Sequence, residues 1–366
     1  MSNSQGFEQS PNDVHPRVSS GQLAVAGVAA LIANGVVYNA TGVRVRAPLP
    51  IATKKLLSRW VERHLESAVL RYPQAMTSGT PSSTVASAEP LSATLHVNDF
   101  DMHYWEWPGS GPTLVCLHPS GHYGRIWERV AQQLAPQYDV LAPDQRGHGD
   151  SGQPPSGNAA VDYASDVEAL AAGRNLQRIV LVGHSLGART AMVHAAEHPE
   201  RVSHMILVGG PHFSTIQPSA DVDHWTGNAN AMRQRSKQLP SADAAADILR
   251  TSYPRFTEAD IQHAVKYNTQ PAAGGGLEWK YEPSWVADGL VHALDDLRPY
   301  AARIRCPILI LRATGSWELT AERMPHVIRV FSNTQVTVVD IDASANLEVE
   351  APDAVAAAIR DYLSTN

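Results

Sequence analysis

The residues with the clearest chemical potential form the stretch Gly183-His184-Ser185-Leu186-Gly187, in which a serine stands between two glycines. Apolar residues 179–182 precede it and small residues at 188–196 follow it, which predicts a buried strand turning sharply into a helix. The glycines permit that turn, and Ser185 is then held at its apex beside the N–H groups of the helix N-terminus, which favour negative charge. The pattern therefore predicts a nucleophile elbow with Ser185 as the attacking hydroxyl.

The segments around this stretch alternate between apolar, strand-like runs and helical patterns. The expected strands are Ala93–Val97, Met102–Trp107, Thr113–Leu117, Tyr138–Ala142, Met205–Val208, Ile308–Leu311 and Gln335–Ile341. The expected helices between and after them are Ile126–Leu134, Tyr163–Gly173 and Pro352–Leu363. Alternation at this spacing predicts an α/β fold with a parallel sheet and right-handed crossovers.

Two parts of the chain interrupt this alternation. Residues 212–298 hold helical stretches and an aromatic cluster, which indicates a helical cap inserted into the sheet domain. Residues 1–90 read as an N-terminal extension with a polar tail, an apolar stretch at 21–37, an amphipathic helix at 51–72 and a Pro/Ser/Thr-rich linker at 74–90. We therefore expect an extension (1–90), a core in two parts (91–211 and 299–366) and the cap between them (212–298).

Composition limits the classes of function. The chain has 366 residues, of which 43% are hydrophobic and 18% charged, as in a soluble globular protein. A net charge of −7 argues against a nucleic-acid partner. The two cysteines, Cys116 and Cys306, form no disulfide framework. His194 and His198 formally match a zinc-protease motif, but they lie on the helix leaving the elbow, so we expect neither a metal nor another cofactor.

The apolar stretch 21–37 bears on where the protein is found. Its uninterrupted part is about half of what a membrane-spanning helix needs, so we expect no stable span. A packed or partner-facing helix in a cytoplasmic protein is the preferred interpretation, and the extension then offers a surface for a homo-oligomer. An export signal or membrane association through 21–37 remain the alternatives.

The region from Leu91 to Leu363 resembles the α/β-hydrolase superfamily. The resemblance rests on three loop motifs in the family's order and spacing: His118-Pro119-Ser120-Gly121, Asp144-Gln145-Arg146-Gly147-His148-Gly149 and the elbow. It implies an eight-stranded, mostly parallel sheet with helices on both faces and a cap after the sixth strand. It also implies an oxyanion hole formed by the backbone N–H groups of Ser120 and Leu186.

The chain departs from this family where a histidine base is expected. In the family the histidine lies between the last strand and the last helix, and here Ala345 takes its place. We prefer the account of a laboratory His-to-Ala substitution, and a natural protein without the base is the alternative. If a base is missing, Ala345→His should raise ester hydrolysis at least about a thousandfold. Glu318 is the first choice for the orienting acid, with Asp340 and Asp342 in reserve.

The resemblance implies a serine hydrolase of a carboxylic ester or lactone, and the aromatic residues of the expected cap favour a medium-sized apolar or aromatic substrate. A carbon–carbon bond hydrolase, or a non-hydrolytic binding protein or cyclase, is the alternative. Haloalkane dehalogenases and epoxide hydrolases need an aspartate at the elbow, and Ser185 argues against them. The candidates for contact with the small-molecule substrate are His122, His184, His212, Phe213, Trp225 and Trp279.

Overall fold

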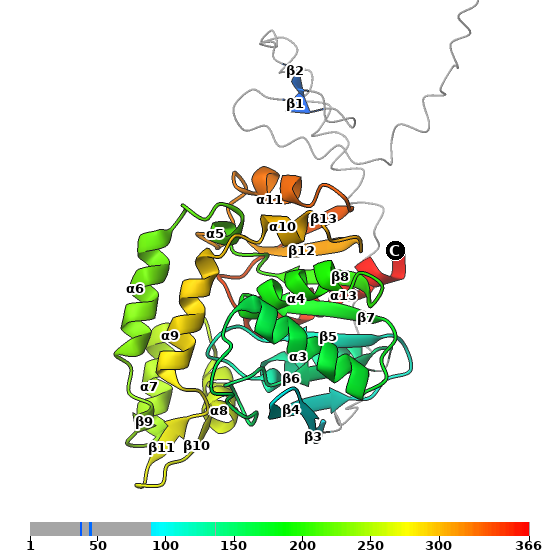
Figure 1. The fold of residues 1–366 in the computed structure, drawn as a ribbon. Helices are drawn as coiled ribbons and strands as arrows, with labels where there is room; N and C mark the ends of the chain where they lie inside the picture. The colour runs from blue at the N-terminus through cyan, green and yellow to red at the C-terminus, as the bar shows by residue number, and fades with distance from the viewer. Residues whose placement is uncertain (1–36, 39–43, 46–88, 136, 366) are drawn as a thin grey trace, which may run out of the picture. The chain divides into compact units, whose positions relative to one another are not determined.

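The computed structural model describes residues 37–38, 44–45, 89–135 and 137–365 (Figure 1). The chain divides into two compact units, residues 1–83 and 84–366. In the first unit, β1 (Val37–Tyr38) pairs antiparallel with β2 (Arg44–Val45). The expected tail, the amphipathic helix and nearly all of the apolar stretch and the linker lie outside the described residues. No helix in the described part of the chain is long and apolar enough to cross a membrane.

The second unit is built on an eight-stranded sheet whose strand order is β13-β12-β8-β7-β5-β6-β4-β3. Neighbouring strands from β13 to β6 pair in parallel. At the other edge, β4 pairs antiparallel with both β6 and β3. The strands are β3 (Leu91–Val97), β4 (Phe100–Trp107), β5 (Thr113–Leu117), β6 (Asp139–Pro143), β7 (Ile179–His184), β8 (Val202–Val208), β12 (Ile308–Ala313) and β13 (Val336–Ile341). All the expected strands are confirmed, with ends shifted by a few residues, and so is the mostly parallel α/β fold.

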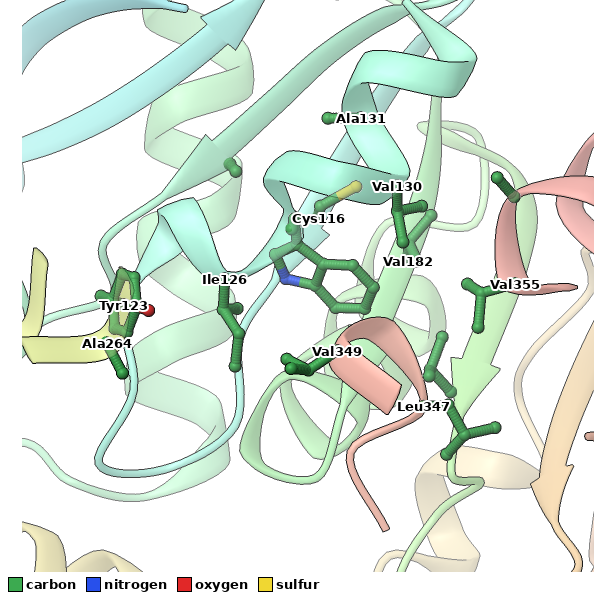
Figure 2. Packing of buried hydrophobic residues seen from close by; sticks show 14 of the residues in the cluster. Cys116, Tyr123, Ile126, Val130, Ala131, Val182, Ala264, Leu347, Val349 and Val355 are labelled. Carbon is green, nitrogen blue, oxygen red and sulfur yellow. The ribbon is translucent and has the colours of Figure 1, made fainter. Parts of the chain in front are cut away.

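One hydrophobic core covers the first face of this sheet. Alternate residues of a strand point to opposite faces, so Val182 belongs to this core and its neighbour Leu181 to the other. Figure 2 shows Cys116 and Val182 of the sheet with Val130 and Val355 from two covering helices. The helical segments on this face are η1 (Gly124–Trp127), α2 (Glu128–Leu134), α12 (Leu347–Glu350) and α13 (Pro352–Thr365). The expected helix Ile126–Leu134 is therefore a 3₁₀ turn continued by α2.

The second core covers the opposite face, and it includes the helix that follows the elbow. Ala188, Ala191 and Ala195 on that helix are all buried against the sheet. Their small side chains allow close packing, which holds the helix and the end of β7 in a fixed relation. The helices on this face are α3 (Ala160–Gly173), α4 (Leu186–Glu197), α10 (Arg298–Ala301) and α11 (Met324–Val330).

The cap gathers to one side of the sheet (Figure 1). Its helices are α5 (Phe213–Ile216), α6 (Val222–Arg233), α7 (Ala242–Ser252), α8 (Glu258–Asn268), α9 (Pro283–Val291) and η2 (His292–Leu294). Besides these helices the cap contains a small antiparallel sheet, formed by β9 (Gln238–Leu239), β10 (Thr269–Pro271) and β11 (Leu277–Trp279). Gly275 and Gly276 form the turn between β10 and β11. Their φ angles of +91° and +74° belong to a backbone conformation that residues with a side chain rarely adopt.

Candidate active site

The elbow has the strained geometry that its sequence predicts. Ser185, between β7 and α4, has φ +53° and ψ −110°, a region that residues with a side chain rarely occupy. A Cβ atom on Gly183 would lie 2.3 Å from the Gly187 carbonyl oxygen, and one on Gly187 would lie 2.2 Å from the Leu117 carbonyl oxygen. Both positions therefore require glycine, and the close packing that they permit holds the serine at the end of the strand.

The Ser185 hydroxyl lies at the start of a chain of two hydrogen bonds. Its Oγ is 2.9 Å from Nε2 of His212, and Nδ1 of His212 is 2.8 Å from Oε2 of Glu318. A carboxylate offers no proton, so the imidazole donates its Nδ1–H to Glu318 and accepts the serine proton at Nε2. The side chains of His212 and Glu318 are only 10% and 12% exposed, so the arrangement is shielded from bulk water.

Sheet topology explains why these three residues meet. β7, β8 and β12 are adjacent parallel strands, so their carboxyl ends lie side by side at one edge. Ser185 directly follows β7, His212 lies in the loop after β8 and Glu318 lies in the loop after β12. The edge of a parallel sheet beyond the carboxyl ends of its strands is where open α/β sheets bind ligands.

We expected this chain to lack a base beside Ser185, but the structure places the His212 imidazole there. Ala345 lines the same cavity as Ser185, as expected of the loop after β13, and its methyl group cannot accept a proton. However, β13 is the edge strand, whereas the loop after β8 leaves the strand next to the elbow. His212 therefore reaches Ser185 from a neighbouring position, and an imidazole is already present at hydrogen-bonding distance.

Burial and neighbouring groups act in opposite directions on Glu318. Burial raises the pKa of its carboxyl, but the adjacent His212 and the backbone of Ser214 and Phe213 lower it, and the net effect is a lowered pKa. Glu318 is therefore ionised at neutral pH and suited to orient the imidazole. The ring of Trp225 packs edge-on against His212, with centroids 4.4 Å apart and planes at 88°, which also fixes the orientation of the imidazole.

A cavity of about 350 Å³ opens above the serine. Among the expected substrate contacts, His122, His184, His212 and Trp225 line it, whereas Phe213 and Trp279 do not. Phe213 is buried beneath the Arg323 guanidinium instead, and Trp279 lines a second cavity under the cap. The sequence reasoning missed several other lining residues, which come mainly from the cap and from the loop after β12: His224, Asn228, Tyr253, Ser316 and Trp317.

The two backbone N–H groups expected to form an oxyanion hole occupy fitting local structures. Leu186 is the first residue of α4, so its N–H belongs to the helix N-terminal amides that have no partner within the helix. Ser120 lies in a turn closed by the His122 N–H donating to the Pro119 carbonyl at 3.2 Å, with Gly121 at φ +76°. The proline at position 119 thus leaves the Ser120 amide in place.

The remaining imidazoles of the cavity have partners of their own. His122 Nε2 is 2.9 Å from the Tyr253 hydroxyl, and burial, followed by the charges of His184 and His148, lowers the pKa of His122 to about 3. His122 is therefore neutral at neutral pH. His184, expected as a substrate contact, pairs through Nδ1 with the fully buried Glu348 at 2.9 Å.

Two groups of side chains in the described part of the chain have the spacing of metal ligands. Glu168, His194 and His198 form the first, and in it Arg201 already pairs with Glu168 at 2.6 Å. His103, Asp144 and Asp150 form the second group.

In the second group Asp144 accepts the backbone N–H groups of Gly124 and Asp150, besides the contact of one of its oxygens with His103 Nδ1. Its carboxylate is thus engaged in holding the loop after β6. Neither group faces the cavity above Ser185.

Comparison with known proteins agrees with the fold. Residues 112–342 match the family described as the alpha/beta hydrolase fold. The chain is 27% identical over 255 residues to 2-(acetamidomethylene)succinate hydrolase of Mesorhizobium japonicum, covering 70% of this chain and 89% of that protein. The crystal structure of E-2-(acetamidomethylene)succinate hydrolase superposes with a TM-score of 0.67 and 25% identity, covering 75% of this chain and 99% of the other.

Other relatives have different named activities. The chain is 25% identical over 264 residues to an esterase of Mycobacterium tuberculosis, covering 71% of this chain and 85% of that protein. It is 34% identical over 229 residues to a soluble epoxide hydrolase of a Corynebacterium species, covering 58% of this chain and 77% of that protein. The similarity thus extends to several kinds of hydrolase rather than to one substrate.

Proposed function

Because this chain belongs to the α/β-hydrolase family, we propose that it is a serine hydrolase of a carboxylic ester or lactone, with Ser185 as nucleophile, His212 as base and Glu318 as the orienting acid. The observation that supports this proposal most strongly is the unbroken path from the Ser185 hydroxyl through both ring nitrogens of His212 to the Glu318 carboxylate, with 2.9 Å and 2.8 Å between the bonded atoms. This is the constellation of a serine triad, recognised by geometry rather than by position in the chain.

The acylation step follows from these contacts. Nε2 of His212 takes the hydroxyl proton as Ser185 Oγ bonds to the substrate carbonyl carbon, and the carbonyl electron pair moves to oxygen. The Leu186 and Ser120 amides stabilise this oxyanion, and loss of one such donor typically costs about 3 kcal/mol. When the intermediate collapses, the leaving oxygen departs with the proton from His212.

Deacylation repeats the same transfers with water. His212 removes a proton from a water molecule as its oxygen attacks the acyl carbon, and the imidazolium then returns the proton to the Ser185 oxygen. Glu318 stabilises the imidazolium in both steps because it remains ionised. The proton balance closes at the serine, so this reaction needs no resident cofactor.

The identity of the nucleophile separates ester hydrolysis from epoxide opening. A carboxylate that opens an epoxide forms an ester, which water cleaves. Ser185 attacking the same carbon would form an ether, which has no carbonyl for water to attack. We therefore favour an acyl substrate for this chain, although a relative is named an epoxide hydrolase. The apolar and aromatic lining contributed by Trp225 and Trp317 fits a medium-sized apolar or aromatic group.

The test is hydrolysis of p-nitrophenyl esters of increasing acyl size by the unaltered chain, with the intact protein mass measured early in turnover. We expect an acyl adduct on Ser185 and loss of both adduct and turnover in Ser185→Ala. Ser203→Ala, which removes a hydroxyl bonded to the Ile179 carbonyl far from the cavity, is the matched control and should keep full activity. Hydrolysis that persists in Ser185→Ala would contradict the proposal.

A further inference from the structure

A second cavity, of about 260 Å³, lies beneath the cap and adjoins the cavity above Ser185. The two cavities share His122 and Tyr253 as lining residues, and these side chains hydrogen-bond each other at 2.9 Å. A substrate whose carbonyl lies at Ser185 can therefore extend past this pair into the space under the cap. We call this space the cap cavity.

Most of the charged groups that line the cap cavity are already neutralised by one another. Arg125 pairs with Glu128 at 2.7 Å, and Glu128 also meets His263 at 2.7 Å. Arg129 pairs with Asp260 at 2.8 Å. These carboxylates and cations therefore supply structure to the wall rather than unsatisfied charge.

Arg235 differs from these residues. It lines the cap cavity from the loop between α6 and β9, and its one hydrogen bond in the described part of the chain goes to the Tyr281 hydroxyl at 3.3 Å. Its neighbours along the chain are paired outside the cavity, Arg233 with Asp288 at 2.7 Å and Lys237 with Glu282 at 3.6 Å. Arg235 is thus a half-buried guanidinium that faces a cavity with no carboxylate partner in the described residues.

We propose that the cap cavity is the subsite for a carboxylate group of the substrate and that Arg235 is its counter-charge. A planar guanidinium matches a carboxylate in geometry, and a half-buried site makes that charge-assisted contact stronger than it would be in water. This inference rests on the proposed hydrolysis at Ser185 and adds the substrate class, namely esters in which a second, anionic carboxyl group lies at a distance from the scissile carbonyl.

A second polar group that lines the cap cavity agrees with a polar ligand. Asn268 is 3% exposed, its Nδ2 donates to the Gly121 carbonyl at 3.0 Å, and its Oδ1 has no hydrogen-bond partner among the described residues. Buried polar atoms without a partner are rare in folded proteins. Arg235 offers donors and Asn268 an acceptor to a ligand in the cap cavity, and polar groups of this kind orient a bound ligand.

The experiment compares p-nitrophenyl monoesters of succinic, glutaric and adipic acids with the same esters whose free carboxyl is methylated. The unaltered chain should hydrolyse the best-fitting acid at least about tenfold better in kcat/KM than its methylated counterpart, the scale of one charge-assisted contact. Arg235→Gln should lower kcat/KM for the acid about tenfold or more, mainly through KM, and leave the methylated ester within about twofold. Arg233→Gln is the matched control and should change neither.

The outcomes separate this inference from the proposed function. If the methylated esters are hydrolysed but the acids are not preferred, or if Arg235→Gln affects both equally, the subsite is refuted and the hydrolase stands. If no ester is hydrolysed, calorimetric binding of glutarate to the chain decides the matter, because binding that is lost in Arg235→Gln and kept in Arg233→Gln supports the subsite without turnover. Equal binding by both variants, or none by the unaltered chain, would refute it.

Discussion

Replacing His212 by alanine gives the sharpest prediction, because no other side chain in the described residues hydrogen-bonds the Ser185 hydroxyl. The change removes the imidazole that lies 2.9 Å from the Ser185 hydroxyl and the link to Glu318. Triad members act as a unit, so kcat should fall on the order of 10⁴–10⁶-fold, which corresponds to about 5–8 kcal/mol of transition-state stabilisation. The readout is steady-state hydrolysis of the best p-nitrophenyl ester.

A histidine introduced at position 345 distinguishes a chain whose base is His212 from a chain that lacks its base. The set comprises the unaltered chain, His212→Ala, Ala345→His and the double variant. If His212 is the base, the unaltered chain is active and Ala345→His does not gain a thousandfold. His96→Ala, which removes an exposed imidazole paired with Asp101, controls for loss of a histidine–carboxylate pair. An inactive unaltered chain that Ala345→His activates about a thousandfold would refute the reasoning.

Three further perturbations have defined outcomes. Glu318→Gln should lower kcat by a factor on the order of 10³–10⁴. The pKa of Glu318 in the folded protein lies below its ordinary value of 4.5, so its ionised form adds stability above pH 4.5, and this stability is lost as the pH falls through the folded pKa. Glu318→Gln should therefore make Tm less dependent on pH in the acid range. Burial raises the pKa of Cys306 to about 12 and that of Cys116 further, so a thiol reagent should label neither until denaturant is added. Gly187→Ala should abolish soluble or active protein, as judged by expression and turnover, because its Cβ would lie 2.2 Å from the Leu117 carbonyl oxygen.

Local patterns in the sequence were sufficient for the sheet and the elbow. A run such as 179–182 is apolar because both faces of a central parallel strand are buried, so it can be recognised without knowledge of its neighbours. The cap helices α6 and α9 are hard to recognise in the sequence because each carries a glycine, Gly227 or Gly289, and polar residues that weaken the helical pattern. The strands of the cap are only two or three residues long, too short for any periodicity to show.

The partner of Ser185 could not be chosen from the sequence, because the choice depends on strand order. The sequence shows His212 in the loop after the sixth expected strand, but it also shows other histidines close to expected loops and does not distinguish among them. Only the adjacency of β7, β8 and β12 brings that loop beside the elbow and beside Glu318. The family pattern places the histidine after the last strand, which in this chain is the position of Ala345. A pattern tied to one loop cannot indicate that a histidine from another loop lies at the same place in the structure.

The most direct test of the central claim, that Ser185 is activated by His212 in the chain as it stands, is the rate at which a fluorophosphonate labels Ser185. We predict that the unaltered chain is labelled to one equivalent, with the adduct mapped to the peptide containing Ser185, and that His212→Ala is labelled far more slowly. Absence of labelling in the unaltered chain, with labelling only after Ala345→His, would contradict the claim.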